Sequence, residues 1–142
     1  MTATLTQIRS ALANQIATQI TGLRASEEVP AAINPPMAVV GPNAGTFAEY
    51  EVTMGPNQAV VNWSIRVYLI LSYGNVVSSQ KKLDAYLSPT GSQSLVQAVN
   101  HDPSLGGVAD FAVVARAQRY GLVSYNGVDY LGAEVMVDVS AS

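Results

Sequence analysis

Residues 59–73 read Ala-Val-Val-Asn-Trp-Ser-Ile-Arg-Val-Tyr-Leu-Ile-Leu-Ser-Tyr, and their alternation decides the fold class. Every second position from Val61 to Leu71 is apolar or aromatic, whereas the positions between include Asn62, Ser64, Arg66 and Tyr68. A period of two with β-branched and aromatic side chains predicts a half-buried strand, with one face in the core and one face outside.

The neighbouring segments predict strands that pair with this one. Residues 46–53 alternate as well, with Glu49 and Glu51 on one side and Tyr50 on the other. Residues 54–58, Met-Gly-Pro-Asn-Gln, predict a turn, so residues 46–73 resemble a long hairpin.

A second hairpin and a short strand complete the predicted sheet. The dipeptide Asn126-Gly127 between strand-forming residues predicts a type I′ turn. It would join a strand over residues 108–120, with a bulge, to a return strand over residues 128–139. A short buried strand is predicted over residues 37–40, after a proline-rich stretch.

Three segments carry helical periodicity. The first has apolar residues at steps of three and four, a cap at Thr4 or Thr6 and a stop at Gly22; its apolar positions are Leu5, Ile8, Leu12, Ile16 and Ile20. A second helix is predicted from a cap at Ser78 or Ser79 to the turn at Pro89, and a third over residues 92–100. We therefore expect a single α+β domain over residues 1–142, with helices packed on one face of a mostly antiparallel or mixed sheet.

The composition excludes several classes of protein. Charged residues make up only 12% of the 142 residues, about half the usual share of ~25%, which favours a surface partly covered by partners. The net charge of −3 gives no overall basic footprint for nucleic acid. With no Cys and one His, we expect no disulfide, no multi-His metal site and no cofactor. The longest apolar run, residues 67–71, is far short of the ~20 residues of a membrane span, so we expect a soluble protein made in the cytoplasm.

Residues with catalytic chemistry are few. His101 and Asp102 are adjacent, which is typical of a solvated loop, and a hard-cation site from Asp102 and Asp110 has no recognisable spacing. Arg66 is expected on the polar strand face, alone or paired with a carboxylate of a neighbouring subunit. Arg116 and Arg119 are three apart on a strand, so strict alternation points them to opposite faces and predicts no nucleic-acid patch.

Four segments, in this order along nearly the whole chain, resemble the small tail terminator proteins of long-tailed (siphovirus-type) bacteriophages, especially those of actinobacterial hosts. The first is the N-terminal helix with Gly22-Leu23-Arg24-Ala25 and the proline-rich stretch 29–40. The others are residues 79–91, Ser-Gln-Lys-Lys-Leu-Asp-Ala-Tyr-Leu-Ser-Pro-Thr-Gly, residues 105–110, Leu-Gly-Gly-Val-Ala-Asp, and Tyr120-Gly121 leading to residues 127–134.

The resemblance implies a tail-terminator-like subunit that forms a hexameric ring in the neck of the virion. The ring would cap the tail tube, stop its polymerisation and present a surface to the head-side stopper. Genome DNA would pass through its pore without specific binding, and the family offers no catalytic residue to carry over.

Within this expectation, the hairpin over residues 46–73 is the candidate surface for subunit contacts or for docking on the tail tube protein. Its candidate residues are Tyr50, Met54, Pro56, Asn57, Arg66 and Tyr68. The candidate pore-lining residues are Glu49 and Glu51, whose charges would repel phosphates so that DNA slides.

Two alternatives stay open. Another neck component, such as a head-completion or stopper protein, would bind the portal side rather than the tail tube. A small ligand-binding or hydrolytic domain would need a pocket with converging polar groups.

Overall fold

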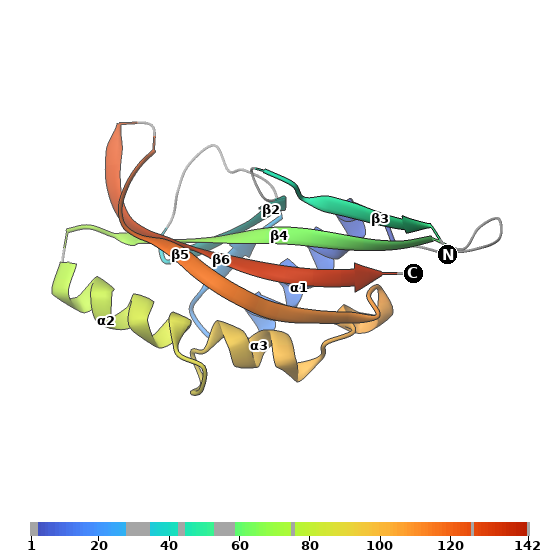
Figure 1. Cartoon of the computed structure of the whole chain (residues 1–142). Coiled ribbons are helices and arrows are strands. Elements are labelled where there is room, and N and C mark those ends of the chain that lie inside the picture. Colours follow the sequence, from blue (N-terminus) through green and yellow to red (C-terminus); the bar gives the residue numbers. More distant parts are fainter. Residues whose placement is uncertain are drawn as a thin grey trace.

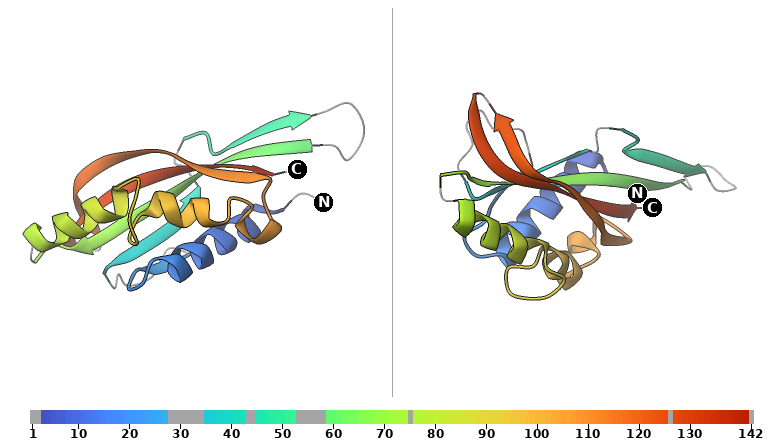
Figure 2. Two further views of the ribbon diagram at one scale, coloured as in Figure 1. Left: turned by 90° about the horizontal axis from the view of Figure 1, so that it is seen from below. Right: turned by 60° about the vertical axis from the view of Figure 1, so that its left-hand side comes forward.

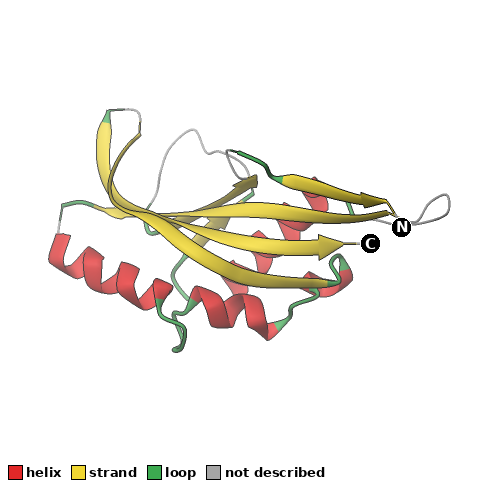
Figure 3. Ribbon diagram, viewed as in Figure 1, coloured by secondary structure: helices red, strands yellow, loops and turns green. Residues whose placement is uncertain are grey.

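The structure is a computed structural model that describes residues 3–27, 35–42, 45–52, 59–74, 76–125 and 127–141. The elements follow in the order α1 (Leu5–Gln19), β1 (Arg24–Ser26), β2 (Met37–Pro42), β3 (Ala48–Val52), β4 (Ala59–Ser72), α2 (Val76–Leu87), α3 (Leu95–His101), a short 3₁₀ segment η1 (Leu105–Gly107), β5 (Phe111–Tyr125) and β6 (Val128–Ala141). They form an α+β fold with one mixed sheet and helices beside it (Figures 1 and 3).

The sheet has the strand order β1-β2-β4-β6-β5, and β3 pairs with β4 on the same side as β2. All of these pairs are antiparallel except β1 with β2, which is parallel. The hairpin of residues 46–73 is confirmed, since Glu49 lies opposite Asn62 in the β3–β4 ladder. The second hairpin is confirmed too, because Tyr125 pairs with Val128 and Gly127 has a φ of 78°. Asn126, which would define the turn type, lies outside the described residues.

All three helices pack on one face of the sheet (Figure 2). The odd-numbered side chains of β4 and β6 point to this side, and Ile65, Val67, Leu69, Val135 and Val137 are almost fully buried. The helical stripe of α1 meets them, with Ile8, Leu12, Ile16 and Ile20 wholly inaccessible. The alternation and the helical period thus describe two sides of one core.

The first helix begins as its sequence predicts. Thr4 accepts a hydrogen bond from the Gln7 backbone N–H, and the Gln7 side chain accepts one from the Thr4 N–H in return. This capping box satisfies two donors that the first helical turn leaves without partners.

The second and third helices begin at other residues than predicted. α2 begins at Val76, and the Ser79 hydroxyl donates to the Ser72 carbonyl at 2.6 Å, so Ser79 ties the helix to the end of β4 instead of capping it. α3 begins after Ser94, whose hydroxyl accepts from the Gln97 N–H, whereas a start near Ser92 was predicted.

Strand β5 also differs from its predicted span of residues 108–120. Gly106 and Gly107 have φ values of 73° and 96°, which delays the strand to Phe111. At its other end β5 continues to Tyr125, because two register shifts absorb extra residues without ending the ladder to β6.

Candidate functional site

The sheet face opposite the helices is the strongest candidate for a functional surface. We call it the uncovered face, because no described helix lies over it (Figure 2). The even-numbered side chains of β4 and β6 project from it. Some of its residues are nonetheless buried, among them Met37, Ile70, Glu134, Met136 and Ser140. Glu134 is notable among these, because a buried carboxylate is costly unless it is paired.

Glu134 is held between two arginines. Nη1 of Arg66 donates to Oε1 of Glu134 at 2.8 Å, and Nε of Arg119 lies 3.2 Å from Oε2 without the geometry of a hydrogen bond. The Glu134 side chain is 2% exposed, whereas Arg66 is 31% and Arg119 is 75% exposed. The carboxylate therefore anchors two guanidinium groups that reach solvent.

Tyr68 completes this group. The guanidinium of Arg66 lies 5.6 Å from the centre of the Tyr68 ring, within the range of a cation–π contact. Burial raises the pKa of the Tyr68 hydroxyl, and the negative charge of Glu134 raises it further. The positive charges of Arg66 and Arg119 lower this pKa by less. Tyr68 is therefore a neutral phenol at pH 7 that restricts the position of Arg66.

Arg119 reaches the uncovered face because of its backbone. It lies in a bulge between Gln118 and Gly121 and has a φ of 57°, a left-handed conformation that L-residues avoid. Arg116 pairs with Met136 and so projects from the same face. The prediction that Arg116 and Arg119 point to opposite faces is wrong, because strict alternation does not allow for the inserted residue. We call Arg66, Arg116 and Arg119 the arginine cluster.

A trough of about 330 Å³ lies on the same face, at the end of the sheet where β4 begins. One cross-strand row runs from Glu49 through Asn62 and Ser140 to Phe111, and the next includes Ser64, Asp138 and Val113. Glu49 is exposed there, on the same face as the arginine cluster. Glu51 follows two positions later in β3, opposite Val60, and its side chain lies outside the described part.

The described docking residues lie on both faces of the sheet. Tyr50 pairs with Val61 and therefore lies on the opposite face from Arg66 and Tyr68. It is 70% exposed and contacts Trp63 edge-on, with ring centroids 6.5 Å apart. The three other predicted residues, Met54, Pro56 and Asn57, lie outside the described residues.

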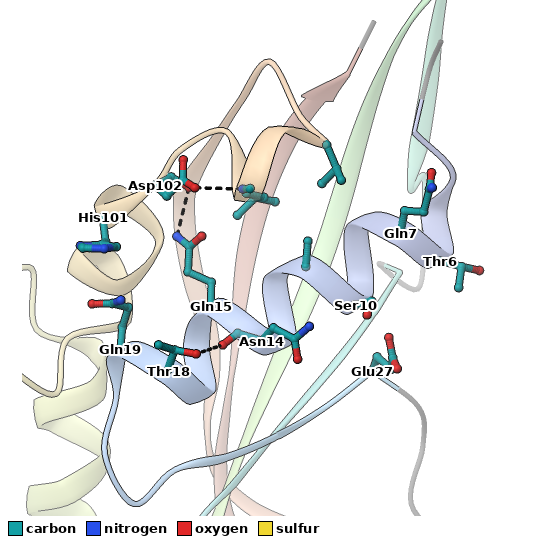
Figure 4. A pocket seen from close by; sticks show the side chains of 14 residues that line it. Thr6, Gln7, Ser10, Asn14, Gln15, Thr18, Gln19, Glu27, His101 and Asp102 are labelled. Atoms are coloured by element: carbon teal, nitrogen blue, oxygen red, sulfur yellow. Dashed lines mark hydrogen bonds between the residues drawn. The ribbon is translucent and has the colours of Figure 1, made fainter.

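A separate hollow of about 760 Å³ lies between α1 and residues 101–108 (Figure 4). Gln15 bridges its two sides, because Nε2 donates to the carbonyls of Ala98, Val99 and Asp102 at 2.8, 3.0 and 3.1 Å. Asp102 accepts hydrogen bonds from the Ser104 hydroxyl, the Ser104 N–H and the Gly106 N–H. These hydrogen bonds lower the pKa of Asp102, and the bond from the Ser104 hydroxyl has the largest effect. Asp102 thus organises its own loop.

The described residues place no three His, Asp or Glu side chains together in a way that could hold a metal ion. No helix among them is long and apolar enough to cross a membrane. Comparison with protein-family models and with curated protein sequences gives no match for this chain.

Proposed function

We propose that this protein is a structural subunit of a bacteriophage neck, a tail terminator that closes into a ring on the tail tube. The observation that carries the proposal is the position of the exposed apolar side chains. At the end of the sheet where β4 begins these are Phe47, Tyr50, Phe111 and Val113. Toward the end where β4 finishes they are Tyr73, Val77, Tyr120, Leu122 and Val128.

The two groups are far apart and different. They lie at opposite ends of β4, whose 14 residues span about 45 Å at ~3.3 Å per residue. At one end the β5–β6 hairpin curls away from the helices, and at the other lies the β3–β4 hairpin (Figure 1). Two unlike apolar ends on one subunit favour head-to-tail contacts, which give a closed ring when the rotation closes.

The composition and the sequence resemblance support the same proposal. A chain with 12% charged residues has little charge to cover a free surface, which suits a subunit flanked by copies of itself, the tail tube and the head-side stopper. The segments quoted above resemble tail terminators in order along the chain. We infer a structural role in the virion rather than a catalytic one.

The first test is the mass in solution, measured by light scattering over a concentration series with and without tail tubes. A hexamer of 14.9 kDa subunits has a mass of about 89 kDa. A ring that assembles alone or on the tube end supports the proposal, and a monomer that binds no tube contradicts it. Binding to the portal complex instead of the tube would identify another neck component.

A pair of surface variants tests the head-to-tail arrangement. F111S damages one end and L122S damages the other, and both side chains are more than half exposed, so the fold should persist. Each variant alone should fail to form rings, whereas a mixture should form a dimer through its one intact contact. Loss of assembly with F111S alone, and none with L122S, would indicate a two-fold dimer and contradict the ring.

The acidic residues of β3 give a second, finer expectation. We propose that Glu49 and Glu51 face the pore and weaken the contact with DNA by repelling its phosphates. E49Q/E51Q should then slow DNA ejection from assembled particles. An unchanged ejection rate would remove the pore role but not the ring.

A further inference from the structure

The geometry points to the arginine cluster as a binding site for a phosphate group, with Glu134 as the residue that positions it. This goes beyond the proposed ring function and does not depend on it. The cluster contains three of the chain's seven Lys and Arg residues, although the chain as a whole carries a net charge of −3.

The three guanidinium groups surround a small area of the sheet. Arg66 and Arg116 are the register partners of Met136 on either side, so their Cα atoms lie two strand spacings apart, about 10 Å. Arg119 reaches the adjacent Glu134 from its bulge. Phosphate oxygens that approach this area from solvent can therefore meet more than one arginine.

The charge balance favours phosphate over a carboxylate. Three arginines around one carboxylate leave an excess of two positive charges, and within the described residues Arg116 has no ion-pair partner. A terminal phosphate group, a mixture of monoanion and dianion near pH 7, carries ~1.5 to 2 negative charges on average and has three acceptor oxygens. Each guanidinium offers five N–H donors in a planar fork. Arg66 directs one nitrogen to Glu134, and Arg119 forms only an ion pair with it.

The backbone supplies a second, independent observation. The left-handed φ of Arg119 is unfavourable for an L-residue, yet the side chain of Arg119, 75% exposed, reaches the cluster. Strain of this kind is typical of positions where the direction of a side chain has a function. Glu134 and Tyr68 then hold Arg66 and Arg119 in place before any ligand arrives.

The test uses inorganic phosphate and a 20-base-pair duplex of random sequence as separate probes, with acetate at equal ionic strength as the carboxylate control. Binding is followed at the arginine Nε resonances by NMR and, for the duplex, by fluorescence anisotropy. The key variant is R116Q/R119Q, and its matched control is K81Q/K82Q, which removes the same charge from exposed positions on α2.

We expect phosphate to shift the three arginine resonances and R116Q/R119Q to bind at least about tenfold more weakly, while K81Q/K82Q stays within about twofold. If duplex DNA is the source of the phosphate, it should bind more tightly than inorganic phosphate. The slope of log affinity against log salt concentration should then be about 2 smaller in magnitude for R116Q/R119Q. Equal affinity for the two probes would identify free phosphate as the source.

Three results would overturn the inference: no arginine shift with either probe, acetate binding as tight as phosphate, or equal losses in both double variants. Tight acetate binding would indicate a carboxylate of a protein partner instead. Should R116Q/R119Q unfold, R116Q against K82Q gives the same comparison, since Arg116 holds no ion pair in the described structure. Light scattering on the same samples, with and without tail tubes, separates this site from the ring, because a monomer that binds phosphate but no tube would refute the ring and leave the phosphate site standing.

Discussion

The two faces of the sheet use the same strands in different ways. On the covered face, Leu69 and Val135 belong to a dry core with the helices, and each position follows the alternation of the sequence. On the uncovered face, the buried residues include Glu134, which is kept there by two arginines. The covered face therefore stabilises the protein through apolar burial. The uncovered face buries a paired charge as well, which stabilises less but holds the arginine side chains in position.

The largest effect should come from the covered face. Leu69 is fully buried, so L69A should lower the free energy of unfolding by about 2–5 kcal/mol. V113A, on the uncovered face and 44% exposed, should change it by less than about 0.5 kcal/mol. Urea denaturation measures both, and similar losses would contradict the contrast between the faces.

The next effect separates the charge network from simple burial. R66Q removes the hydrogen-bonded partner of Glu134 and should destabilise the protein by about 2 kcal/mol, below the ~3–5 kcal/mol of a fully buried pair because Arg66 is 31% exposed and Arg119 remains. The double variant R66Q/E134Q should recover part of this loss, since no charge is then left buried.

A double-mutant cycle with R66Q, E134Q and the combined variant measures the coupling by urea denaturation. If the double variant loses the sum of the two single losses, Arg66 and Glu134 do not act as a pair and the network does not stabilise the uncovered face.

The contrast also explains what the sequence could predict. The alternation of β4 and β6 and the helical stripe of α1 are periodic over many residues, so they predicted the covered face and its helices. Strand β1 has three residues, too few to show a period, and it exists through its pairing with β2. The arginine cluster depends on two register shifts in β5, one before Arg116 and one at Arg119, which no periodic pattern reveals.

The described docking residues fall on two faces for a related reason. The parity of Tyr50 in β3 and that of Arg66 in β4 can be compared only when the register of the hairpin is known. Once Tyr50 is placed opposite Val61, it lies on the other face from Arg66 and Tyr68. Glu134 was one scattered carboxylate in the sequence, and only the spatial approach of Arg66 and Arg119 gives it a role.

A smaller effect tests the bulge that turns Arg119 toward the uncovered face. With a φ of 57°, glycine is the least strained residue at this position. R119G and R119A both remove the ion pair, but R119G should be more stable than R119A by about 1 kcal/mol. Thermal denaturation of both variants tests this expectation. If R119A has the higher Tm, the position behaves as in an ordinary strand and the left-handed conformation of Arg119 is contradicted.

The smallest effect lies next to the covered face, in the loop that follows α3. Hydrogen bonds from Ser104 and Gly106 lower the pKa of Asp102 below its ordinary value of 3.8. The folded state therefore favours the carboxylate, and the resulting stability is present above that value and is lost as the pH falls through the lower pKa of the folded protein. D102N keeps an acceptor oxygen for Ser104 but does not titrate. It should have a slightly lower Tm than the natural protein at pH 7, and the difference should vanish as the pH falls well below 3.8. A Tm difference that stays constant between pH 7 and pH 2 would mean that the charge of Asp102 does not hold this loop, and that the oxygen at Ser104 is sufficient.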